Sequence, residues 1–447
     1  MKKITLLISL LSTGFAFTQE VPATLTMQEA IDYALKNNRT AINASKDIDI
    51  ANQQKWETTA SGLPQINGNI DYQNFLKQQV QIIPAEFFGG QPGEFTDVIF
   101  GTKQSANAFV TLEQKIFDGS YIVALQSAKV FLDISKNLKI KTDLEIRRSV
   151  IDAYGNVLLA EESVSILERN IEVLKKNLFE TTKIFENGLG EEENVEQLQI
   201  TLSGVQSNLN NTLRIKKLAY QLFNITLGID VYQNISLTDS LETLAEENRA
   251  LMLLEATNDT KNNIDYQIAE NDTKSKELFV KLEKSNALPK LNAFLNAGYS
   301  AFANEFSFLD SDQRWFGSSL IGVNLNIPIF SSGKRNAATQ RAKIELEKSK
   351  TNLEQIDQRL KLEIESAKND YQFALDDYQN KKENLNLAER IELKNQTKFF
   401  EGIGSSFELR QAQTQLYTAQ QEFLQSMLNV VNSKATLETV LNTPNTN

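Results

Sequence analysis

Residues 185–190 read Phe-Glu-Asn-Gly-Leu-Gly, and residues 399–404 read Phe-Phe-Glu-Gly-Ile-Gly. These two segments stand at the same place in two copies of a longer pattern. Each copy begins with Leu-Pro, at residues 63–64 and 288–289, and continues with Ile-Phe, at residues 116–117 and 329–330. From Phe117 to Gly188 there are about 71 positions, and from Phe330 to Gly402 about 72. Such a constant spacing indicates an internal duplication, in which one supersecondary unit is used twice.

Composition limits the classes of function. Residues 1–18 resemble an export signal, because Lys2 and Lys3 precede a short apolar core at 4–11. That core is shorter than the roughly 18–20 residues needed to span a bilayer. The chain contains no cysteine and no histidine, which removes thiol nucleophiles, imidazole bases and the commonest zinc ligands. Its net charge of −11 argues against nucleic acid as a partner. We therefore expect an exported protein that is not an enzyme and that needs no cofactor or metal.

Each copy contains two stretches in which apolar and polar residues alternate with a period of two, which predicts β-strands. They lie within a hairpin of about 64–117 in the first copy and of about 289–330 in the second. One face of each strand is apolar, and the other carries small and amide side chains.

The segments at 185–190 and 399–404 are called tips below. Between the hairpins and these tips lie helical stretches at about 121–183 and 335–398. At 1.5 Å per residue, roughly 60–66 residues extend over about 90–100 Å. Steps of three and four in the second stretch predict a coiled-coil seam, formed by Leu353, Ile356, Leu360, Ile364, Ala367, Tyr371, Ala374 and Tyr378. Shorter helices are expected after the tips, at about 194–227 and 407–441, and before the strands, at about 42–61 and 266–286. Thr26 and Glu29 form a capping-box pattern that opens the first helix.

This order of elements predicts four segments. Residues 1–18 are the signal peptide, and 19–227 are repeat 1, with its tip at about 185–194. Residues 228–258 are a less periodic linker that we expect to pack on the outside, and 259–447 are repeat 2, with its tip at about 399–407.

Four strands cannot close a barrel, and an open sheet edge in lipid leaves unpaired backbone groups that cost several kcal/mol each. Strands that are apolar on one face and polar on the other are typical of a transmembrane barrel wall. Three copies would supply twelve strands around a water-filled lumen. The predicted fold is therefore mainly α with a β-barrel portion: a long α-helical coiled-coil barrel plus a trimeric 12-stranded transmembrane β-barrel with 4 strands per chain. A soluble β-sandwich is the alternative, but it does not explain the Asn- and Gly-rich second face. Aromatic residues at the strand ends suit the membrane–water girdle: Tyr72, Phe75, Phe302, Trp315 and Phe316.

The doubled Leu-Pro, hairpin, Ile-Phe, long helix and Phe-x-x-Gly-x-Gly turn resemble TolC-type outer membrane efflux proteins, the exit ducts of tripartite pumps and type I secretion systems. The resemblance covers essentially the whole chain after the signal, including the opening segment at 25–38. It implies a homotrimer with its barrel in the outer membrane and a helical tunnel in the periplasm. It also implies two partners, a periplasmic membrane fusion (adaptor) protein and, through it, an inner-membrane transporter. The first hairpin is about 12 residues longer than the second, which predicts an extracellular loop at about 83–102.

The resemblance also implies roles for residues at the tips. The glycine-containing turns would meet the adaptor, because glycine allows positive φ and close approach of the backbone; these positions are Gly188, Leu189, Gly190, Gly402, Ile403 and Gly404. Just past each turn, acidic residues of the family narrow the tunnel. Glu408 matches one of these positions, and Gln411 stands where a second acid would be. The first repeat instead offers Glu191, Glu192, Glu193 and Glu196. The alternative role of these acids is to complement the dipole at a helix N-terminus.

The leading hypothesis is thus a passive exit duct from periplasm to exterior. The alternative is a periplasmic coiled-coil scaffold or adaptor protein without channel activity. The cargo is not specified by the sequence.

Overall fold

The computed structural model describes residues 23–249, 251–256 and 259–442. The predicted export signal at 1–18 lies outside the described residues. The chain divides into two compact units. The sheet unit comprises Asp47–Asn137 and Ile268–Gln355, and the tip unit comprises the described residues up to Lys46, Leu138–Gln267 and the described residues from Ile356 onward. Each unit therefore combines segments from both predicted repeats.

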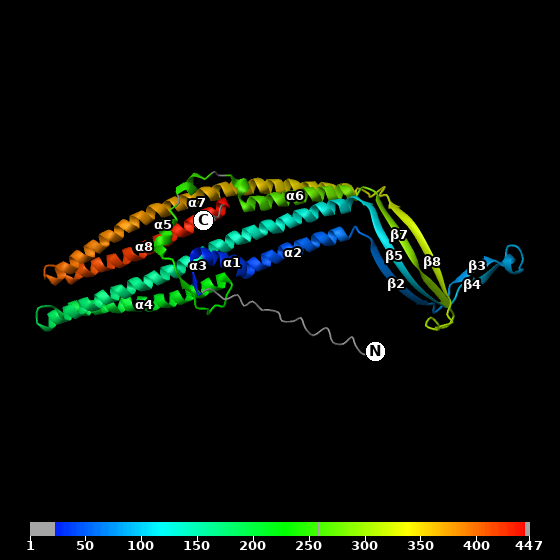
Figure 1. The fold of residues 1–447 in the computed structure, drawn as a ribbon. Helices are drawn as coiled ribbons and strands as arrows, with labels where there is room; N and C mark the ends of the chain where they lie inside the picture. The colour runs from blue at the N-terminus through cyan, green and yellow to red at the C-terminus, as the bar shows by residue number, and fades with distance from the viewer. Residues whose placement is uncertain (1–22, 250, 257–258, 443–447) are drawn as a thin grey trace, which may run out of the picture. The chain divides into compact units, whose positions relative to one another are not determined.

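The sheet unit contains one antiparallel four-stranded sheet (Figure 1). Its strands are β2 (Gln65–Asn74), β5 (Gln104–Asp118), β7 (Lys290–Ala303) and β8 (Trp315–Asn326), in the order β2-β5-β7-β8. The two predicted hairpins are confirmed, and pairing of β5 with β7 joins them into a single sheet. Within the described chain, the outer edges of β2 and β8 have no strand partner.

The strand register separates the two faces of this sheet. One row of paired residues across the four strands consists of Ile70, Ala108, Tyr299 and Gly317. These four positions therefore lie on the same face of the sheet. The neighbouring row, Asn69, Phe109, Gly298 and Ser318, lies on the other. Extended over the whole sheet, the first face carries mostly apolar residues, and the second is rich in Asn, Ser and Gly with a few aromatic residues. The predicted apolar and polar faces are confirmed.

The extra residues of the first hairpin form strands where a loop was expected at about 83–102. Strand β3 (Val80–Pro84) pairs with β4 (Phe95–Ile99) as a separate two-stranded ribbon, and the 3-10 helix η1 (Ala85–Phe88) follows β3. β-branched and aromatic residues favour the extended backbone here. Gly89 and Gly93 have positive φ and reverse the chain between the strands.

The long helices are confirmed and extend a few residues beyond their predicted bounds. α3 spans Gly119–Glu186 and α7 spans Lys334–Phe400. The shorter helices before the strands are α2 (Arg39–Ala60) and α6 (Ile264–Ser285). Helix α2 ends just before Leu63-Pro64, as expected because proline cannot continue a helix. No helix in the described ranges is both long and apolar enough to cross a membrane.

In the tip unit, α4 (Glu192–Leu227) returns after α3, and α8 (Ser406–Leu441) returns after α7. The remaining elements are α1 (Met27–Asn37), α5 (Leu241–Glu247), the 3-10 helices η2 (Leu251–Glu255) and η3 (Thr260–Asn262), and the parallel pair β1 (Thr24–Leu25) and β6 (Ser236–Leu237). The capping box that opens α1 is present.

The predicted seam of α7 forms part of the tip unit's core. Leu360, Ile364, Tyr371 and Tyr378 are buried. The Tyr371 hydroxyl donates to the carbonyl of Asn248 at 2.6 Å. The linker therefore does more than pack on the outside, since Leu241, Leu244 and Ala245 of α5 are buried in the same core.

Candidate functional site

The turns after α3 and α7 share one backbone geometry. Gly188 has a φ of 72° and Gly402 a φ of 74°, a left-handed conformation that costs other residues roughly 1–2 kcal/mol. The N–H groups of Leu189 and Ile403 each donate to a carbonyl five residues earlier at 3.0 Å. This bond, together with one from the N–H of each glycine to the carbonyl three residues earlier, forms a Schellman motif, which ends a helix and satisfies its last carbonyls.

The second glycine of each turn is required for a different reason. A Cβ at Gly404 would lie 2.9 Å from the Cβ of Lys398, and one at Gly190 would lie 3.1 Å from Cγ2 of Ile184. The chain therefore folds back closely against the helix that it has just left. As a result, Leu189 and Ile403 point into solvent, with 82% and 73% of their surface exposed. Each tip thus presents one aliphatic side chain between two glycines.

The predicted aperture acids have different surroundings in the two repeats. Glu408 forms a capping box with Ser405, whose backbone N–H donates to the carboxylate at 3.0 Å. Hydrogen bonds from the backbone and side chain of Ser405 lower the pKa of Glu408. Gln411 is exposed in the next turn of α8.

In the first repeat, Glu191 is the N-cap residue of α4 but makes no side-chain capping bond within the described chain. Glu192 and Glu193 occupy the first turn, and Glu196 follows. All four are exposed, and Glu193 accepts a hydrogen bond from Gln197 at 2.7 Å. Helix capping thus accounts for Glu408, whereas it accounts only in part for the acids of α4.

The starts of α4 and α8 lie side by side. Residues from both helices line one narrow groove, together with Phe399 of α7: Asn194, Gln197, Leu198, Thr201, Phe399, Ser406, Leu409, Arg410 and Gln413. The structure therefore brings the acidic start of α4 close to the start of α8, which carries Glu408. Arg410 places a cation beside them, stacked over the ring of Phe407.

Helix α3 buries polar residues that are not among the predicted site residues. Ser163, Asn170 and Asn177 are buried at intervals of seven residues. Asn170 donates to Gln420 of α8 at 2.9 Å, and Asn177 accepts from Gln396 of α7 at 3.0 Å. The heptad spacing is the sequence signal, because a polar residue at such a seam position fixes how helices align.

The five predicted girdle residues all lie at the same end of the sheet, but on two faces. Tyr72 and Trp315 stand in one row with Ala106 and Ala301, on the apolar face. The loop after β7 folds onto this row, where Phe308 packs against both alanines.

Phe302 and Phe316 lie in the neighbouring rows and therefore on the polar face, with ring centroids 6.3 Å apart. Phe75 follows the end of β2, where its N–H donates to Lys103. Of the four predicted girdle residues that lie on strands, Tyr72 and Trp315 are therefore on the apolar face and Phe302 and Phe316 on the polar face.

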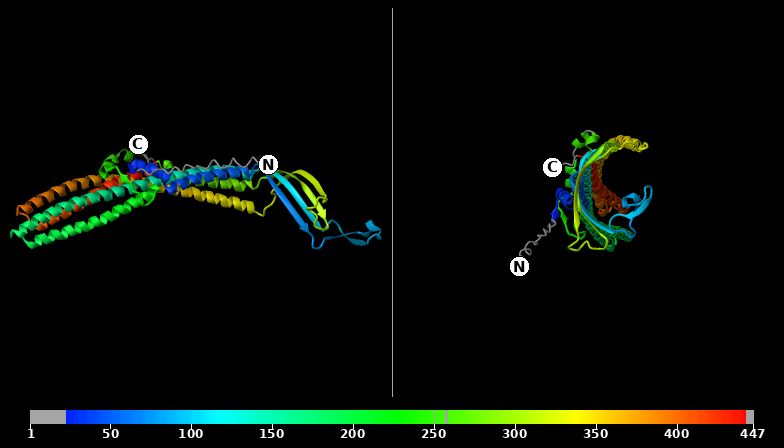
Figure 2. Two further views of the ribbon diagram at one scale, coloured as in Figure 1. Left: turned by 60° about the horizontal axis from the view of Figure 1, so that its bottom comes forward. Right: turned by 90° about the vertical axis from the view of Figure 1, so that its right-hand side faces the viewer.

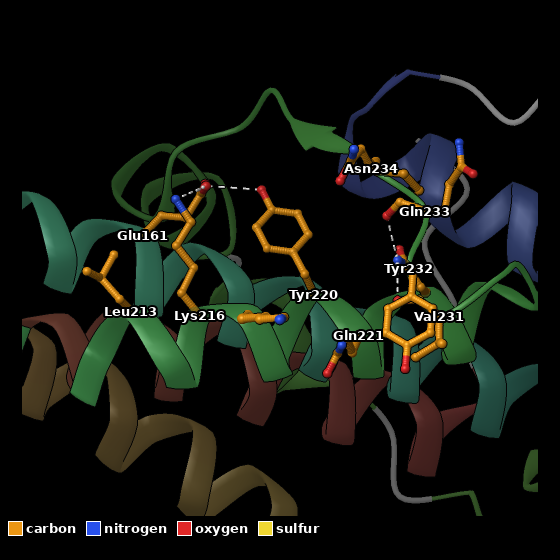
Figure 3. A pocket seen from close by; sticks show the side chains of 12 residues that line it. Glu161, Leu213, Lys216, Tyr220, Gln221, Val231, Tyr232, Gln233 and Asn234 are labelled. Atoms are coloured by element: carbon orange, nitrogen blue, oxygen red, sulfur yellow. Dashed lines mark hydrogen bonds and ion pairs between the residues drawn. The ribbon is translucent and has the colours of Figure 1, made fainter. Parts of the chain in front are cut away.

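A cavity of about 420 Å³ in the tip unit is lined by α4 and the linker (Figure 3). Lys216 and Tyr220 both point toward Glu161, with Nζ at 2.9 Å and the hydroxyl at 3.0 Å from its Oε1. Burial and Glu161 raise the pKa of Tyr220, which keeps the phenol protonated as a donor. Asn224 holds the linker by donating to the carbonyls of Val231 and Gln233. These bonds fasten the linker to α4. The polar residues that line the cavity are therefore explained by the attachment of the linker, without a bound ligand. No cluster that could hold a metal ion occurs among the described residues.

Comparisons with known proteins agree with this geometry. Residues 259–443 match the family model of outer membrane efflux proteins. The chain is similar to the solved structure of CusC, with a TM-score of 0.73 and 18% identity over 93% of this chain and 91% of that one.

VceC of Vibrio cholerae, an outer membrane protein, gives a TM-score of 0.70 and 15% identity, over 93% of this chain and 95% of that one. The MtrE outer membrane channel of Neisseria gonorrhoeae, solved in its open state, gives 0.72 and 16%, over 93% and 88%. No curated protein matches the sequence.

These matches confirm the predicted fold class of a helical barrel with a β-barrel portion. They are matches to channel proteins rather than enzymes, which agrees with a chain that has no thiol or imidazole for catalysis. The resemblance to TolC-type outer membrane efflux proteins is thus confirmed, by the family model over residues 259–443 and by a fold shared with outer membrane channels.

Proposed function

We propose that the protein is a homotrimeric exit duct of a tripartite efflux pump or a type I secretion system. One observation carries the proposal: a four-stranded sheet with one apolar face, one polar face, and two edges that lack a partner in the described chain. An open edge is not tolerated in hydrocarbon, so β2 of one copy must pair with β8 of the next.

The size of the barrel follows from the polar face. Two copies would give eight strands, an interior that side chains just fill. The Asn- and Ser-rich face would then be buried without water, at a cost for every amide that lacks a partner. Three copies give twelve strands and leave room for water along that face.

The helices also present surface that suits neighbouring copies. The C-terminal half of α4 carries four exposed apolar residues at helical spacing: Ile215, Leu218, Leu222 and Ile225. An apolar stripe of this kind on a helix usually faces another element. Contact with a neighbouring copy around the duct would bury it.

The tips suit an adaptor protein. Leu189 and Ile403 are exposed apolar anchors on turns whose shape depends on glycine. An apolar side chain that fills a partner's pocket is a common source of binding energy. The acids next to the tips, Glu191, Glu192, Glu193, Glu196 and Glu408, would form a negative collar when repeated by threefold symmetry.

Conductance and export test the proposal together. Purified protein in planar bilayers should give stable, cation-preferring channels, and the gene together with its adaptor and transporter should restore dye export to cells that lack their own duct. A protein that stays soluble without detergent and conducts no current would support the scaffold alternative instead.

A further inference from the structure

The β3–β4 ribbon has an exposed face that is apolar except for Asp97 and that nothing in the described chain covers. The pairing of Val80 with Ile99, Ile82 with Asp97, and Pro84 with Phe95 places these residues on one face of the ribbon. Ile82 is 73% exposed and Phe95 69% exposed. Phe87 and Phe88 of η1 are also exposed at the far end. A two-stranded ribbon of this size is marginal in water when isolated, so its apolar face needs a partner.

The charge of the ribbon disfavours a lipid surface as that partner. Between Val80 and Phe100 the chain has the acids Glu86, Glu94 and Asp97 and no lysine or arginine. A negatively charged lipid headgroup layer attracts basic segments and repels acidic ones. An apolar protein surface remains the better candidate.

The position of the ribbon points to other copies of this chain. The ribbon connects β2 to β5, and β2 is the edge strand that would adjoin β8 of the next copy. It therefore leaves the sheet next to the proposed contact between copies. In the end-on view of Figure 2, it bends from the end of the curved sheet toward the concave side. The concave side of a sheet that closes into a barrel faces the axis.

The ribbon is also long enough to reach that axis. Twelve strands spaced about 4.8 Å apart and tilted by about 40° enclose a barrel of roughly 12 Å radius. Strand β3 has 5 residues, which extend over about 17 Å. Three ribbons that lean inward would therefore meet over the outer mouth.

We propose that the β3–β4 ribbons of three copies pack their apolar faces together and form a lid over the extracellular mouth of the duct. This inference rests on the proposed trimeric duct and deepens it, because it assigns a constriction to the exit. The partner of each ribbon is the same ribbon in a second copy. Contact between the apolar faces keeps Ile82, Phe95 and Ile99 from water.

The absence of cysteine makes a direct test possible, since one introduced thiol has no native competitor. Ile82→Cys places a thiol on the apolar face. Gln81→Cys is the matched control, because Gln81 is also exposed but its side chain lies on the opposite face. Purified trimers of each variant are treated with a mild oxidant, or with a short bismaleimide, and separated on a denaturing gel. Single-channel conductance is then recorded before and after reduction.

The lid predicts that Ile82→Cys forms covalent dimers of the chain and that Gln81→Cys forms at least fivefold fewer. Oxidised Ile82→Cys channels should conduct less, and reduction should restore the current. Trimers in which Ile82→Cys fails to cross-link, or cross-links no better than the control, would overturn the lid and leave the duct in place. A monomeric protein would overturn both.

Discussion

Replacement of Gly402 by valine tests whether the shape of the tip, rather than the presence of a turn, is what the pump needs. A Cβ at Gly402 would meet no heavy atom of the described residues within 4 Å, so the variant creates no clash. Its cost comes from the backbone, because φ is 74°. A left-handed conformation costs a non-glycine residue roughly 1–2 kcal/mol, and a β-branched residue at least as much. This free energy lowers the population of the native turn about 5- to 30-fold relative to turns that avoid positive φ.

Gly204→Val is the matched control. Gly204 lies inside α4, and a Cβ there would also meet no neighbour within 4 Å among the described residues. Its φ is not in the left-handed region, and valine is no worse than glycine in a helix interior. We expect Gly402→Val to reduce dye export at least fivefold while the protein still forms trimers by light scattering. Gly204→Val should export normally. Wild-type export by Gly402→Val, at an equal amount of protein in the membrane, would refute docking through this turn.

Three further predictions concern the negative collar of acids, the linker and the membrane–water girdle. Replacing the collar acids Glu191, Glu192, Glu193 and Glu408 by glutamine should move the reversal potential in a salt gradient toward zero, and an unchanged potential would contradict the collar. Glu246 of α5 accepts hydrogen bonds from Tyr378, Arg249 and Lys382, which lower its pKa to about 2. Because its folded pKa is depressed, its contribution to stability is present above the unfolded value of 4.5 and is lost as the pH falls from 4.5 toward 2. The Tm difference between wild type and Glu246→Gln should therefore be present at pH 7 and shrink in that window, and a difference that is independent of pH would argue against this ionic anchor. The chain has two tryptophans, so Trp56→Phe leaves only Trp315 at the girdle. Brominated lipids should quench its fluorescence, whereas Trp315→Phe, which keeps Trp56 on α2, should show little quenching; equal quenching of both variants would contradict the girdle assignment.

Periodicity and duplication predicted most of the fold. Apolar residues that recur at steps of three and four lie along one side of a helix, which predicts a continuous buried seam. Leu360 and Tyr371 belong to this pattern, and both side chains are buried. The capping box at Thr26 and the proline at residue 64 mark helix ends through local chemistry, which a sequence shows directly. The two glycines of each tip are also explained by local geometry. The first has a positive φ, and the second lies close to the helix that precedes it.

Features that depend on distant partners were not predicted. The faces of Phe302 and Phe316 follow from the register of β7 with β8, and hydrophobicity gives no sign of that register when aromatic residues occur on both faces. The burial of Leu241 and Leu244 depends on packing of α5 against α8. The sequence predicts a loop at the ribbon because glycine and proline flank short apolar runs, whereas the structure has two paired strands there. The adaptor-docking and aperture roles of the tip residues remain predictions.

Native mass spectrometry of detergent-solubilised protein can count the copies in one particle, because the sheet edges of β2 and β8 can be satisfied in a membrane only by other copies. A shared barrel of twelve strands predicts a particle of three chains that is lost when detergent is removed. A single chain that stays monodisperse in plain buffer would contradict it.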